Sequence, residues 1–228
     1  SREEALRQGK LILVAEDNDI NQKVIRQQLN LLGYAGDIAN DGREALKRLQ
    51  DAWLESTSFN ELKLMPGIVC EGEWKNQPQV TREFLMNLVN SIPENKWWSI
   101  PAFVRAIKEN FPDFQRPAGD YDSWFIKRES DGAYLRGFEH WDAVDGALAR
   151  YMISGPLSWL GRAELAAPEA EAAPSAFRLI PAFEPQEEKG RVMVGSNGRI
   201  SVERLVPRAA RYQIARFCEW EDLDTPHR

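Results

Sequence analysis

The most concentrated chemistry in this 228-residue chain is a run of arginines towards its C-terminal end. Against one acid, Glu203, five guanidinium groups occur within 18 residues, on Arg199, Arg204, Arg208, Arg211 and Arg216. Guanidinium groups bind phosphate oxygens in pairs, and phosphate contacts dominate the affinity of proteins for nucleic acids. The run therefore predicts contact with DNA through a local basic face, in a chain whose net charge is −6. The alternative is a solvated face that pairs with nearby acids, Glu184, Glu187 and Glu188.

A second pair of cations, Lys127 and Arg128, lies in a predicted hairpin over residues 124–138. Ser130-Asp131-Gly132 is a typical turn between two strand-like runs. If this hairpin is a wing, the two cations extend the same nucleic-acid footprint.

Residue types that enzymes use are sparse. The chain has no phosphate-binding loop of the Walker type and no GxGxxG motif. Its two histidines, His140 and His227, and two cysteines, Cys70 and Cys218, are too few and too scattered for a metal site or a catalytic triad. We therefore expect no enzymatic activity and no catalytic residues.

The composition is that of a globular protein, with 43% hydrophobic residues. No apolar run reaches the roughly 18 residues that a membrane span needs. The start, SREEALRQGK, lacks the apolar core of a secretory signal, and the cysteines form no disulfide framework. A cytoplasmic location is expected.

The first fifty residues alternate between strand and helix patterns. LILVA is typical of a buried parallel strand, and Asp19 is the expected N-cap of a helix that ends at Gly33. GDIA predicts a second strand, and a further helix follows the turn at Asn40-Asp41-Gly42.

The sequence ILVAEDNDINQKVIRQQLNLLGY, followed by IANDGREALKRLQ, resembles the first half of a response-regulator receiver domain of the kind attached to hybrid sensor kinases. The resemblance implies that Glu16 and Asp17 help to hold Mg²⁺ beside a phosphoacceptor aspartate, at the carboxyl ends of parallel strands. The second half of the family pattern is missing. Met65-Pro66 echoes its Met-Pro turn, but Leu62 stands where the phosphoacceptor belongs. We expect a phosphorylation-incompetent fragment with a vestigial Mg²⁺ site and no other cofactor.

Two strands cannot close a five-stranded sheet, so this fragment is expected to pack on the next domain or on another chain. The partner would be a different protein or a second copy in a homodimer. A natural fusion, a truncated reading frame and an engineered chimera all fit this pattern.

Beyond Trp53 the chain consists of short amphipathic pieces. Helices are predicted at 78–90, from Ser99 to before Pro112, and from Trp141 to a break at Gly155-Pro156. Helices followed by a strand pair fit a winged-helix unit. The expected pair is FRLIPAF with RVMV, on either side of an acidic connection.

The strongest hairpin signal is Asn197-Gly198, between VMV and RISV. After Pro207 a helix is expected to turn Ala210, Ile214 and Phe217 inward. The segments GFEHWDAVDGALARYMISGPLSWLG, AFRLIP and NGRISVERLVPRAARYQIARFCEW resemble bacterial helicase-associated proteins, in which a winged-helix region leads into a domain similar to the N-terminal region of XPB-type helicases. That resemblance spans about residues 53–220. It implies a role on DNA, in transcription or repair, without an ATPase motor of its own.

The expected fold class is α+β. Four regions are predicted: a partial receiver-like segment at 1–53, a helical and winged-helix body at 54–165, a Pro/Ala/Glu-rich linker or long wing loop at 166–190, and a hairpin with a basic helix at 191–228. The expected function is a non-catalytic regulatory module that binds DNA or a protein partner, away from membranes. The alternatives are response-regulator signalling through Mg²⁺-dependent aspartate phosphorylation, and a purely structural protein-interaction module.

Overall fold

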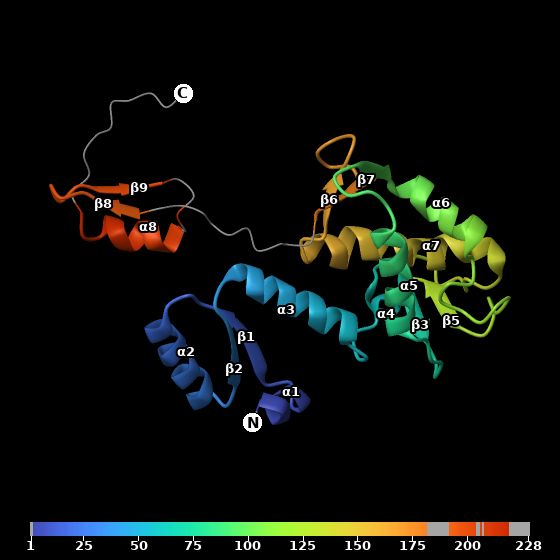
Figure 1. Ribbon diagram of the computed structural model, residues 1–228. Coiled ribbons are helices and arrows are strands. Elements are labelled where there is room, and N and C mark those ends of the chain that lie inside the picture. Colours follow the sequence, from blue (N-terminus) through green and yellow to red (C-terminus); the bar gives the residue numbers. More distant parts are fainter. Residues whose placement is uncertain (1, 182–191, 204–205, 207, 219–228) are drawn as a thin grey trace.

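The computed structural model describes residues 2–181, 192–203, 206 and 208–218 (Figure 1). Helices and short strands alternate along them, which gives the α+β class that the sequence predicts. The strands form four small sheets, ordered β1-β2, β3-β5, β4-β7-β6 and β8-β9. None of the helices in this described part is long and apolar enough to span a bilayer.

The N-terminal unit, called here the receiver-like segment, is a parallel strand pair with three helices. Register pairs Ile12 with Gly36 and Leu13 with Asp37. Helix α2 packs against β2, and α3 contacts both strands and continues towards the rest of the chain (Figure 1). The elements are α1 (Arg2–Arg7), β1 (Leu11–Ala15), α2 (Asp19–Leu31), β2 (Ala35–Ala39) and α3 (Gly42–Glu55).

Helix α2 is capped by Asn18, so the prediction that Asp19 is the N-cap was wrong. The backbone of Asn18 is extended, and its side-chain oxygen accepts hydrogen bonds from the N–H groups of Ile20 (2.9 Å) and Asn21 (3.2 Å). Asp19 is the first helical residue, where its charge still favours the positive end of the helix dipole.

The middle part, called the body, holds the main hydrophobic core. Helix α7 lies at its centre in contact with α4 and α6, and the buried indole of Trp141 donates to the carbonyl of Pro112 at 2.8 Å. The elements are α4 (Glu61–Leu64), β3 (Ile68–Glu71), α5 (Pro78–Asn90), β4 (Trp97–Ser99), α6 (Ile100–Asn110), β5 (Phe125–Arg128), η1 (Phe138–His140), α7 (Trp141–Met152), η2 (Ile153–Leu157), β6 (Ala163–Ala166) and β7 (Ala176–Leu179).

Strand β7 is the central strand of the sheet β4-β7-β6, and this corrects two expectations. Phe177 lies opposite Trp98 of β4 and Leu165 of β6, so the partners of FRLI are not in RVMV. The body therefore extends to Leu179, past the expected boundary at residue 165, and 167–175 is a hairpin connection rather than part of a linker. The physical reason is burial: Phe177 and Leu179 alternate inward into the core.

The chain does not break at Gly155-Pro156 as predicted. It continues from α7 into one π-helical turn, η2, with Pro156 inside it. The wider turn accommodates a residue that has no N–H to donate, and the burial of Ile153 and Leu157 fixes it against the core.

Close packing of α6 on α7 depends on Gly146. A Cβ there would stand 2.9 Å from the Trp141 ring and 3.3 Å from Cγ1 of Val104. We expect Gly146→Ala to lower the free energy of unfolding by about 1–3 kcal/mol, because overpacking outweighs the gain in helix propensity. Urea unfolding checks this. Gly42→Ala in α3, where a Cβ meets nothing within 4 Å, is the matched control and should be neutral or slightly stabilising. Equal effects at the two sites would contradict the packing argument.

The C-terminal unit consists of β8 (Val192–Val194), β9 (Ile200–Val202) and α8 (Arg208–Ala215). The Asn197-Gly198 hairpin is confirmed, with Gly198 at a φ of 79°. The predicted inward position of Phe217 was wrong: the helix ends two residues earlier, and the ring is 84% exposed.

Candidate binding surface

The two acids after β1 make local hydrogen bonds. The Glu16 carboxylate accepts from the backbone N–H of Asn18 (3.0 Å) and from the Asn21 amide (3.2 Å). These bonds, the backbone one first, hold the pKa of Glu16 below its usual range, and Asp17 is exposed beside it. Leu62, which stands where the receiver pattern has its phosphoacceptor, is an apolar residue of α4 buried in the core of the body.

Mg²⁺ requires about six oxygen ligands in near-octahedral geometry. Among the residues that the structure describes, no three His, Cys, Asp or Glu side chains group closely enough to hold a metal ion. Glu16 and Asp17 alone do not fit the ion.

The predicted basic residues are distributed over the C-terminal unit. Arg199 follows the hairpin turn, where its N–H donates to Asn197, and Arg216 lies after α8, with its guanidinium 6.0 Å from the Phe217 ring. Arg208 begins α8 and Arg211 lies within it. Arg204 lies outside the described residues.

The cations of the predicted hairpin, Lys127 and Arg128, point in different directions. Arg128 bonds to Asp131 at the turn (2.7 Å), and Lys127 pairs with Glu71 of β3 at 2.8 Å. The Lys127–Glu71 pair lowers the pKa of Glu71 and raises that of Lys127. Of the two, only Lys127 belongs to the surface described next.

Strands β3 and β5 present one buried and one exposed face. Ile126 and Leu135 point into the core, while the alternate residues point outward because side chains alternate along a strand. On the outer side Val69 is 44% exposed, Phe125 43% and Tyr134 45%. We call this surface the outer face; its residues are Val69, Glu71, Phe125, Lys127, Tyr134 and Arg136.

Cationic side chains make cation–π contacts with aromatic rings on the outer face. The Arg136 guanidinium lies 4.8 Å from the Phe125 ring and 5.1 Å from the Tyr134 ring, and the two rings meet edge to face. Lys127 Nζ lies 4.8 Å from the Tyr134 ring. These contacts fix exposed aromatic side chains and a guanidinium in one arrangement.

No family model, curated protein or solved structure matches this chain. Sequence analysis found Lys127 and missed the other residues of the outer face. The available signal was the alternation on both sides of the turn, Phe125 with Lys127 and Tyr134 with Arg136.

A buried ion pair joins α3 to the body. The fully buried guanidinium of Arg82 bonds to both carboxylate oxygens of Glu61, at 2.7 and 3.1 Å. It also donates to carbonyls at the end of α3 and in the loop after it, those of Trp53, Leu54, Ser56 and Phe59. The Trp53 indole donates to Glu61 at 2.7 Å. Every member has a partner, so this network is structural.

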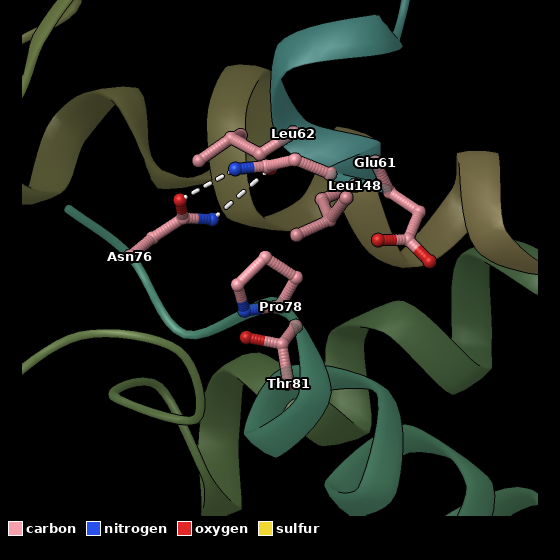
Figure 2. Close-up of a pocket in the computed structure, with 7 residues that line it drawn as sticks. Glu61, Leu62, Asn76, Pro78, Thr81 and Leu148 are labelled. Atoms are coloured by element: carbon pink, nitrogen blue, oxygen red, sulfur yellow. Dashed lines mark hydrogen bonds between the residues drawn. The ribbon is translucent and has the colours of Figure 1, made fainter. Parts of the chain in front are cut away.

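A small indentation beside Glu61 is closed to ligands. Asn60 and Asn76, which both line it, exchange amide hydrogen bonds at 2.7 and 3.2 Å. In Figure 2, Asn76 lies above Pro78 and Thr81. The space between the lining residues totals about 160 Å³ but nowhere admits a water molecule. It is a packing feature.

A second buried cluster surrounds Asp145 of α7. One carboxylate oxygen accepts from the Gln115 amide (2.6 Å) and from Nε of Arg116 (2.9 Å). The other oxygen and Oε1 of Gln115 are buried and have no hydrogen-bond partner among the described residues. Burial raises the pKa of Asp145, and Arg116 stacks on the Trp124 ring at 4.5 Å.

Proposed function

We propose that this chain is a non-catalytic regulatory module of winged-helix type that acts by binding a protein partner. The order α5, β4, α6, α7 and hairpin β6–β7, with sheet order β4-β7-β6, supports the winged-helix assignment. In such units the third helix, here α7, is the one that enters the DNA major groove.

Helix α7 is enclosed, which argues against that use. Seven of its twelve residues are buried, including Trp141, Asp145 and Leu148. A recognition helix must present a polar face to base edges. Helices α4 and α6 pack on α7, and Asp142 is its only fully exposed residue, so little of the helix is available to a duplex.

The outer face carries the proposal. Exposed aromatic rings held under a guanidinium match the Tyr- and Arg-rich centres of protein interfaces. The charge of Lys127 is offset by Glu71, and no described carboxylate pairs with Arg136. A near-neutral surface with one available guanidinium suits a protein that offers a carboxylate among apolar groups, and suits a phosphate backbone poorly.

Selection of displayed random short peptides on the immobilised full chain tests this. We expect enriched peptides to carry an acid flanked by aromatic or aliphatic residues. Binding should weaken at least about tenfold in Tyr134→Ser/Arg136→Glu, because such variants remove a hot spot and reverse its charge. Isothermal titration of the enriched peptides measures this.

Lys75→Glu is the control, since it changes charge at an exposed position that is not part of the outer face. It should bind the peptides as the unaltered chain does. Peptides that bind the outer-face variant equally well would refute the proposal.

DNA contact by the C-terminal unit is the second candidate. Tyr212 and Phe217 are exposed next to Arg211 and Arg216, an interleaving typical of single-strand binding. Anisotropy of labelled single-stranded and duplex DNA across a salt series tests it. Salt-sensitive binding that Arg211→Glu/Arg216→Glu abolishes and the outer-face variant leaves unchanged would favour this candidate.

A further inference from the structure

Strand β1 has an open edge. The N–H of Glu16 donates to the carbonyl of Ala39 (3.0 Å), and the carbonyl of Lys10 accepts from Ala35 (2.9 Å). Bonds to one neighbour come from alternate residues of a strand. The backbone groups that face away from β2 therefore belong to Leu11, Leu13 and Ala15. No other strand of the described chain pairs with them.

The sheet face beside this edge is also uncovered. Helix α2 lies over β2, so closely that a Cβ at Gly36 would stand 3.1 Å from Leu29. On the neighbouring strand Ile12 remains 37% exposed, and Ile20 and Val24 of α2 are exposed as well. An occupant of the edge would bury apolar surface in addition to forming backbone hydrogen bonds.

The two edges of the sheet differ in protection. Edge strands are usually blunted by charge, proline or a bulge. Strand β2 carries Asp37, which binds Arg2 and Arg48. Strand β1, LILVA, has none of these features. Its edge is open to a strand of suitable chemistry.

We propose that the occupant is a second copy of this chain, whose β1 pairs antiparallel with β1 across a two-fold axis centred on Leu13. This register sets the outward-facing Leu11 opposite Ala15 of the second copy and Leu13 opposite itself. It also brings Lys10 opposite Glu16 of the second copy, and the symmetry repeats that pair.

Charge complementarity selects this occupant and this register. Lys10 and Glu16 flank an uncharged strand at equal distances from Leu13, so the strand is complementary to its own reverse. Opposite charges on facing strands stabilise the pairing. A two-fold axis normal to the sheet leaves both α2 helices on one face, where Ile12 of each copy lies opposite Val14 of the other.

Sedimentation equilibrium of the full chain over a concentration series tests the dimer. We expect a dimer that dissociates on dilution. Lys10→Glu and Glu16→Lys should each weaken it about tenfold, because two attractive cross-strand pairs become repulsive. An equimolar mixture of the two variants should form a heterodimer as tight as the original, since mixing restores both pairs.

Two further variants make the result specific. Lys23→Glu changes charge on the exposed surface of α2 and should leave the dimer intact. Ala15→Pro removes an outward N–H while leaving the bonds to β2, so it should weaken the dimer without loss of circular dichroism. A monomer at all concentrations, or a dimer that tolerates both charge reversals and gains nothing on mixing, would overturn the proposal.

Discussion

Arg82→Met is expected to lower the free energy of unfolding by about 3–5 kcal/mol, because it leaves the buried carboxylate of Glu61 without its charge partner. Four carbonyls around the α3–α4 connection lose a donor in the same step. Urea unfolding gives the free energy. Hydrogen exchange should show faster opening of the last turn of α3 than of α7.

Arg105→Met is the control for this change, because Arg105 is an exposed arginine on α6. It should alter stability by no more than about 0.5 kcal/mol. The double variant Arg82→Met/Glu61→Leu separates charge from carbonyl bonding. It should recover part of the loss and no more, since the carbonyls stay unpaired. A full recovery would show that those carbonyl bonds contribute little.

Replacing Asp145 should give the second largest loss in the free energy of unfolding. Asp145→Ala is expected to cost about 3–5 kcal/mol at neutral pH, because Arg116 is left buried without a carboxylate. Asp145→Asn keeps the shape and the bond from Gln115 to the retained oxygen, and should cost clearly less. Thermal or urea unfolding of the two variants measures the difference.

The pH dependence of the Asp145 contribution has a defined sign. Burial raises the pKa of this carboxyl in the folded state, so folding favours the protonated form. The stability that arises from this pKa difference is full below the ordinary aspartate pKa and is lost as the pH rises through the folded-state pKa. Relative to Asp145→Asn, the unaltered chain should therefore lose stability as the pH increases across that window. A difference that is constant with pH would contradict this account.

Local patterns located many elements. The helix predicted at 78–90 agrees with α5 at both ends, because Pro78 fixes the first turn and the apolar residues recur at helical spacing. The Asn197-Gly198 turn fixed the β8–β9 hairpin for a similarly local reason. Such features depend on neighbours in sequence.

Long-range features could not be predicted in this way. Arg82 lies within TREF as an ordinary polar helix residue, and nothing nearby in the sequence shows that carbonyls about 25 residues earlier surround it. The pairing of β7 with β4 joins residues roughly eighty positions apart, so the strand predicted at FRLIPAF was assigned the wrong partner, RVMV. The outer face depends on β3 meeting β5, which periodicity does not specify.

The contacts of Arg82 also define where one folding unit ends and the next begins. A cut between residues 53 and 54, where the receiver-like pattern stops, would remove the Trp53 indole and carbonyl that Glu61 and Arg82 bind. Gln50 of α3 also contacts the body, because its side-chain amide donates to the carbonyl of Leu160 at 2.7 Å. The end of α3 thus belongs to both parts, and the smallest autonomous body has to include a stretch of helix that its own sequence resemblance would exclude.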